Sequence, residues 1–93
     1  MSHYETNEGI VWREKDGLCI VLSTVSGHYF TFNKTGTLLW RGLIAEKKSI
    51  SSVIGSIADH FPSAPPITEI EQQCRQLVEE WISESLVRMV RPA

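Results

Sequence analysis

The stretch of residues 27–40 constrains the fold of this chain most, because a strand-forming half passes without a break into a helix-forming half. Residues 28–32 read His-Tyr-Phe-Thr-Phe, and aromatic and β-branched residues of this kind favour a pleated, half-buried strand. Because successive side chains of a strand point to opposite faces, Phe30 and Phe32 share one face. This segment is therefore predicted to be a strand that runs into a helix.

The start of that helix is marked by residues that can cap it. Asn33, or Thr35 two residues later, offers a side-chain oxygen to the free amides of a first helical turn. Leu39, Trp40 and Leu43 then recur at helical spacing. We therefore expect the helix to begin where the strand ends.

Two further strands are predicted before this one. Residues 10–14 begin with Ile10, Val11 and Trp12, residues 18–22 are an apolar run, and Asp16 and Gly17 between them favour a tight reversal. The second run lacks alternation, so its strand should be covered on both sides or central. The resulting antiparallel meander places residues 28–33 at an edge. Another extended segment could pair with such an edge, unless its own helices cover it.

Two helices are predicted after residue 48. The first starts at the capping residue Ser49 and buries a face of Ile50, Val53, Ile54, Ile57, Ala58 and Phe61. After a proline-rich connector, Thr68 and Glu71 have the spacing of a capping box for the longest helix. That helix has an apolar face of Ile70, Cys74, Leu77, Val78, Trp81 and Leu86.

One flank of the long helix is broader than a core contact needs. Ile82 widens the apolar stripe beside Val78, and Glu71, Arg75 and Glu79 follow one another at i+4 spacing. This flank either lines a groove or carries solvated charges beside a broad core stripe.

The fold class predicted from these elements is α+β: a three-stranded antiparallel meander followed by three helices, in a winged helix-turn-helix-like arrangement. Ninety-three residues support one small core. We expect a flexible tail over residues 1–8 and a single domain over residues 9–90. Residues 86–91 should form a short terminal strand or an extended tail.

Composition and charge exclude several classes of function. The formal net charge of −2 gives no electrostatic basis for gripping a phosphate backbone. Cys19 and Cys74 lie in apolar settings and form no C-x-x-C pair, which favours buried thiols over a zinc site, although a disulfide between them stays open. No segment is long enough to cross a membrane, and the first eight residues lack the apolar core and basic start of a signal peptide, so a cytoplasmic location is expected.

Catalysis is not expected, because no nucleophile, base and orienting group share a predicted pocket. Cys19 is predicted inside the sheet and Cys74 on a core face, and the three histidines have no spacing that suggests partnership. We therefore expect no catalytic residues, no metal site and no cofactor.

The run Gly-His-Tyr-Phe-Thr-Phe-Asn-Lys-Thr-Gly-Thr-Leu-Leu-Trp-Arg, residues 27–41, resembles the centre of the PqqD-like family. Within it, the Asn-x-Thr-Gly and Trp-Arg pattern is most similar to the stand-alone B1 proteins of lasso-peptide biosynthesis. The resemblance extends from Gly9 to about Val87. It departs from the usual pattern in ending the strand with Phe32-Asn33 where Leu-Asn is commoner.

This resemblance implies a non-catalytic recognition element for ribosomally synthesised, post-translationally modified peptides (RiPPs). The leader of a precursor peptide would add as a strand to the third strand and lie between it and the third helix. Carried over by position, the peptide-binding residues are His28, Tyr29, Phe30, Thr31, Phe32, Arg75, Val78, Glu79 and Ile82. The implied further partners are a transglutaminase-like cysteine protease, which is the B2-type leader peptidase, and the cyclase.

Two alternatives stay open at this point. One is a PqqD-type peptide chaperone of another RiPP pathway, such as that of pyrroloquinoline quinone (PQQ). The other is a winged-helix DNA-binding regulator. The long helix argues against the regulator, because its glutamates outnumber the single Arg75 and would repel phosphate.

Overall fold

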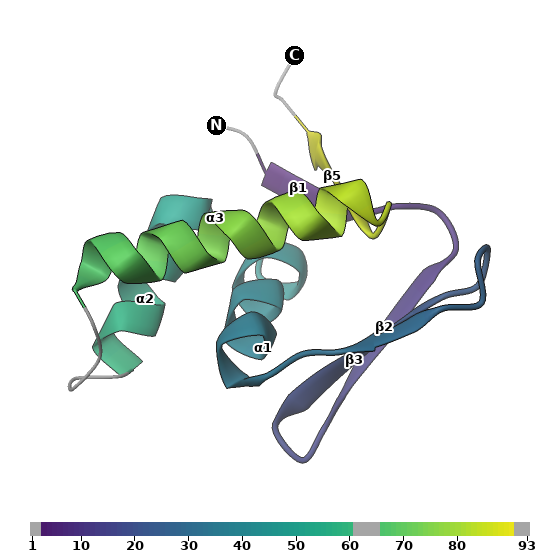
Figure 1. The fold of residues 1–93 in the computed structure, drawn as a ribbon, viewed down its shortest axis with the longest axis horizontal. Coiled ribbons are helices and arrows are strands. Elements are labelled where there is room, and N and C mark those ends of the chain that lie inside the picture. The colour runs from purple at the N-terminus through teal and green to yellow at the C-terminus, as the bar shows by residue number, and fades with distance from the viewer. Residues whose placement is uncertain (1–2, 61–65, 91–93) are drawn as a thin grey trace.

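The computed structural model describes residues 3–60 and 66–90 of the chain. A three-stranded sheet lies on one side of the helices, and α3 runs along α2 and α1 toward β1 and β5 (Figure 1). The elements in chain order are β1 (His3–Thr6), β2 (Ile10–Lys15), β3 (Leu18–Ser23), β4 (Tyr29–Thr31), α1 (Lys34–Trp40), the π-helical segment η1 (Arg41–Ala45), α2 (Ile50–His60), α3 (Ile67–Ser83) and β5 (Val87–Val90). The α+β class and the strand-then-helix order agree with the prediction.

The three-stranded sheet is antiparallel in the order β2-β3-β4, which confirms that β4 is an edge strand. The β2–β3 hairpin turns at Asp16 and Gly17, which have φ angles of 54° and 79°. Two successive positive φ angles are typical of the type I′ turn that suits such hairpins. The strand β3 is central, but it is not covered on both sides, because Leu18 and Leu22 are 39% and 40% exposed.

The strand-to-helix junction forms as predicted, with Asn33 and not Thr35 as the capping residue. The Asn33 Oδ1 accepts a hydrogen bond from the Gly36 amide at 2.9 Å. The last turn of this helical stretch widens into η1, where the Glu46 amide donates to the Arg41 carbonyl five residues back. A side chain at Gly42 would lie 2.6 Å from Val53, so glycine allows η1 to approach α2 closely.

The two later helices begin differently from each other. Ser49 caps α2 as predicted, because its Oγ accepts a hydrogen bond from the Ser52 amide at 3.2 Å. The capping box predicted at Thr68 is wrong: α3 already begins at Ile67, and Pro66 precedes it without a side-chain cap. The Pro66 carbonyl instead accepts from two amides of the first turn. The predicted contact of Phe61 and most of the proline-rich connector lie outside the described residues.

Four aromatic rings form a cluster that joins the sheet to α3. Trp12 contacts Trp40 edge-on, and Trp40 contacts both Phe32 and Trp81. Phe32 and Trp81 are stacked, with centroids 4.9 Å apart and planes inclined by 20°. Aromatic pairs at such distances stabilise a core beyond the area they bury. Through this cluster α3 packs against the end of β4.

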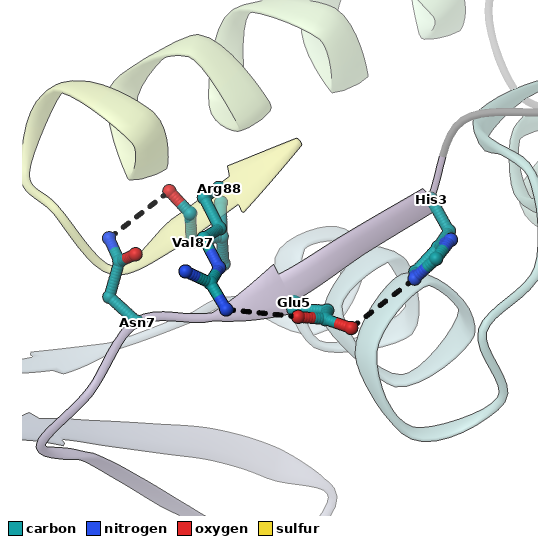
Figure 2. Close-up of polar contacts among 5 residues, drawn as sticks. All are labelled: His3, Glu5, Asn7, Val87 and Arg88. Atoms are coloured by element: carbon teal, nitrogen blue, oxygen red, sulfur yellow. Dashed lines mark hydrogen bonds and ion pairs between the residues drawn. The ribbon is translucent and has the colours of Figure 1, made fainter. Parts of the chain in front are cut away.

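The N-terminal segment differs from its prediction as a flexible tail. His3–Thr6 form β1, which pairs with β5 in a separate two-stranded antiparallel sheet, with His3 opposite Val90 and Thr6 opposite Val87. The polar composition suggested fraying. The pairing could not be read from this segment alone, because its partner strand β5 is far away in sequence. Polar side chains also fasten this pair: the Glu5 carboxylate contacts His3 and Arg88, and Asn7 reaches β5 (Figure 2).

Replacing Asn7 with alanine should loosen the join between the two ends of the fold. The Asn7 Nδ2 donates to the carbonyl oxygens of Ser85 at 2.8 Å and Val87 at 3.4 Å. We expect Asn7→Ala to lower the free energy of unfolding by about 1 kcal/mol, as is usual for a side-chain hydrogen bond. Urea denaturation measures this loss, and Glu8→Ala, an exposed neighbour, is the control. A loss equal to the control's would show that these bonds do not stabilise the fold.

Among the described helices, none has the length and the apolar character needed to cross a membrane.

Candidate functional site

The outer edge of β4 presents unpaired main-chain groups. The Phe32 amide donates to the Cys19 carbonyl, and the His28 carbonyl accepts from the Ser23 amide. The main-chain N–H and C=O groups of the even-numbered residues in this stretch therefore face β3. Alternation along the strand then directs the N–H and C=O groups of Tyr29 and Thr31 away from the sheet. The edge can accept one more strand at these two residues.

A groove of about 590 Å³ follows this edge and is closed on its other side by α3. Residues 29–33 of the strand and its end form one wall, and the last two turns of α3 form the other. In Figure 1, the chain that leads from the sheet into α1 passes beneath this half of α3. The residues that α3 and its C-cap contribute to the groove are Leu77, Glu80, Trp81, Ser83 and the C-cap Glu84. A segment added to β4 would therefore lie against α3 as well.

The groove has an apolar floor and an acidic rim. Phe32 and Trp81, which stack on each other, both line it, and so does Leu86. Glu80 and Glu84 are exposed and bring two carboxylates to the α3 wall, and no lysine or arginine is among the described lining residues. The floor suits apolar side chains, while the rim adds negative charge.

A second hollow of about 240 Å³ extends the groove toward the start of α1. It shares Asn33, Leu77 and Glu80 with the groove and adds Thr35, Gln73 and Gln76. The amide and hydroxyl groups here can donate and accept hydrogen bonds. The two hollows together form a channel along one flank of α3.

The structure brings together most of the site residues predicted on β4. Tyr29, Phe30, Thr31 and Phe32 all line the groove. Tyr29 is 71% exposed, and Phe32 is buried, as the predicted alternation of faces requires. His28 lies just before β4 and outside the groove lining, and its carbonyl is used to bond Ser23.

The four residues predicted on α3 do not join them in the groove. Val78 is buried in the core. Arg75 and Glu79 line a different hollow, on another face of the helix, and Arg75 forms an ion pair there with Glu71 at 3.0 Å. Ile82 is 41% exposed and is absent from the groove lining. The groove is therefore lined by the opposite flank of α3.

The thiols of the chain are not arranged for catalysis. Both cysteines are free and fully buried. Burial raises the pKa of the Cys19 thiol to about 11, and the Glu14 carboxylate adds to this rise. Burial also raises the pKa of the Cys74 thiol. A thiol with a raised pKa is a poor nucleophile at neutral pH. Within the described residues, no cluster of His, Cys, Asp and Glu could hold a metal ion.

Comparison with known proteins places these features in a family. A family model described as coenzyme PQQ synthesis protein D (PqqD) matches residues 19–87, which is most of the chain. The chain belongs to the PqqD family. The match begins in β3 and ends in β5, so it includes β4, α3 and the whole groove.

Two solved structures share this PqqD fold. One, "TbiB1 in Complex with the TbiA(beta) Leader Peptide", superposes with a TM-score of 0.81 at 18% identity and covers 90% of this chain and 94% of its own. The other, "Lasso peptide synthetase B1 complexed with the leader peptide", has a TM-score of 0.77 at 19% identity and covers 92% and 98%. No curated protein sequence matches the chain.

The sequence did contain one sign of the flank of α3 that lines the groove in this PqqD-family chain. Leu77 was assigned to the core face, but it lies at the margin of the apolar stripe and is only partly buried. Leu77 is followed three and seven positions later by Glu80 and Glu84, so these residues form a flank of mixed apolar and acidic character. Its counterpart on the other side is Ile82 with Arg75. The two flanks are alike in pattern, so periodicity alone could not choose between them.

Proposed function

We propose that this chain is a non-catalytic recognition element that binds the leader of a lasso-peptide precursor by β-strand addition to β4. The observation that carries the proposal is the open edge at Tyr29 and Thr31, which lies beside a groove with an apolar floor. Main-chain hydrogen bonds would set the register of the bound strand, and the groove would select alternate side chains.

The comparisons support the choice of ligand. The two structural neighbours are described as complexes with leader peptides, and each shares at least nine-tenths of its length with this chain. Lasso leaders resemble the pattern Tyr-x-x-Pro-x-Leu. Proline stiffens an extended segment, and tyrosine and leucine bury area, which suits an edge strand over Phe32 and Trp81.

The bound precursor would then pass to separate enzymes in the cytoplasm. A transglutaminase-like leader peptidase and the cyclase are the proposed recipients. Because strand addition holds the leader by its backbone, the core peptide that follows it stays available to an enzyme. In this proposal the chain contributes binding and presentation, while the chemistry belongs to its partners.

A fluorescence-polarisation titration tests the proposal directly. A labelled Tyr-x-x-Pro-x-Leu leader peptide is expected to bind saturably with a Kd of about 1 μM or tighter. Replacing its leucine with alanine should weaken binding, because the apolar floor loses a contact. A labelled DNA duplex, which serves as the control, should not bind. Binding of the duplex alone would instead support a DNA-binding regulator.

A second candidate follows from the description of the family, which refers to coenzyme PQQ synthesis. The same edge and groove would then bind the peptide precursor of that coenzyme. Titration of both precursor peptides against the same protein distinguishes the two pathways, since the cognate peptide should bind more tightly.

A further inference from the structure

The α3 wall of the groove carries charge of one sign. Glu80 and Glu84 line it, and within the described part of the chain neither forms an ion pair. By contrast, Glu14 in the sheet contacts Arg41, and Glu71 on the opposite flank of α3 contacts Arg75. The two groove carboxylates are therefore available to a ligand.

The spacing of these carboxylates matches that of an added strand. Residues four apart on a helix are separated by about 6 Å along its axis. Side chains two apart on a strand are separated by about 6.8 Å and point to the same face. On a strand paired with β4, the residues opposite Phe30 and Phe32 have the inward orientation of those side chains, toward α3. Successive inward side chains of a bound peptide would thus come near Glu80 and Glu84 in turn.

We infer that the groove selects peptides with lysine or arginine at inward-facing positions of the bound strand, and that Glu80 and Glu84 are the residues that determine this selectivity. The inference rests on the proposed function, because it requires an added strand. It specifies the ligand further as an extended basic peptide, with a cation that reaches one carboxylate and a second cation two residues away that reaches the other. Apolar side chains at the remaining inward positions would contact the floor.

A positional scan of the labelled Tyr-x-x-Pro-x-Leu peptide tests this inference. Each variable position, and two flanking positions on either side, is made lysine, glutamine or glutamate in turn. The lysine peptides should bind roughly threefold to tenfold more tightly than the glutamate peptides, but only at alternate positions. Raising the salt concentration from 50 to 500 mM should reduce this preference, because screening weakens exposed charge pairs.

Matched variants of the protein test whether Glu80 and Glu84 cause the preference for lysine peptides. Glu80→Gln and Glu84→Gln should each reduce the lysine preference about threefold, and the double variant should remove it. Glu79→Gln is the control, because Glu79 lies on the same helix but lines a different hollow. Equal binding of lysine and glutamate peptides at every position would overturn the inference and leave the proposed function intact. Failure of every peptide to bind would overturn both.

Discussion

Thr31→Pro is expected to abolish strand addition while leaving the domain folded. The Thr31 amide points away from β3, so proline removes a donor from the open edge and places its ring where a partner strand would approach. Losing that hydrogen bond, and leaving a peptide carbonyl without its partner, should weaken leader binding by at least about tenfold. Because proline is tolerated on edge strands, the cost in stability should be small.

Polarisation titration of the Thr31→Pro protein checks the expected loss of leader binding, and thermal unfolding of the same samples checks that the fold is retained. Thr31→Val is the matched control, because it keeps the amide and the β-branched side chain and should bind like the natural sequence. Phe30→Pro gives the opposite comparison, since the Phe30 amide faces β3 and its loss should destabilise the sheet itself. Unchanged affinity in a folded Thr31→Pro protein would show that the peptide does not pair with β4.

Trp40→Ala is expected to destabilise the domain severely. Trp40 is fully buried and contacts three other aromatic rings, so truncation leaves a large cavity at the centre of the core. Replacing a buried tryptophan with alanine typically costs about 3–5 kcal/mol, which is a large part of the total stability of a domain of this size. Urea denaturation followed by far-ultraviolet circular dichroism measures the loss.

Trp40→Phe separates packing from polarity in this position. The Trp40 Nε1 is buried without a hydrogen-bond partner among the described residues, so phenylalanine removes an unsatisfied donor together with some volume. The loss should therefore be only about 1 kcal/mol. If phenylalanine were as damaging as alanine, the indole nitrogen would have a role that the packing does not account for.

Much of the fold followed from local signals in the sequence. The aromatic strand, the Asn33 cap and the Asp16-Gly17 turn each depend on residues close to one another, and each forms as predicted. No local signal predicted the π-helical turn at η1, in which Gly42 lies close against Val53 of α2. Likewise, β1 forms only because β5 lies beside it.

The candidate site likewise has one part that local sequence signals predicted and one part that depends on packing between distant segments. The edge character of β4 follows from strand order, which the turns of the meander determine, and of the residues predicted there all but His28 line the groove. The α3 wall depends on which flank of the helix turns toward the end of β4, where Phe32 stacks on Trp81. A helical repeat identifies two flanks of an apolar stripe, but it contains no information about which flank turns toward the sheet.

The pairing of β1 with β5 also has a consequence for how this domain can be connected to other proteins. His3 and Val90 are opposite each other in an antiparallel ladder, where paired Cα atoms are about 5 Å apart. The points at which the chain enters the domain through β1 and leaves it through β5 are therefore adjacent. Such a domain can be inserted into a surface loop of a larger enzyme, or circularly permuted through a short linker, without stretching the host. The edge strand β4, which belongs to the other sheet, would stay open in either arrangement.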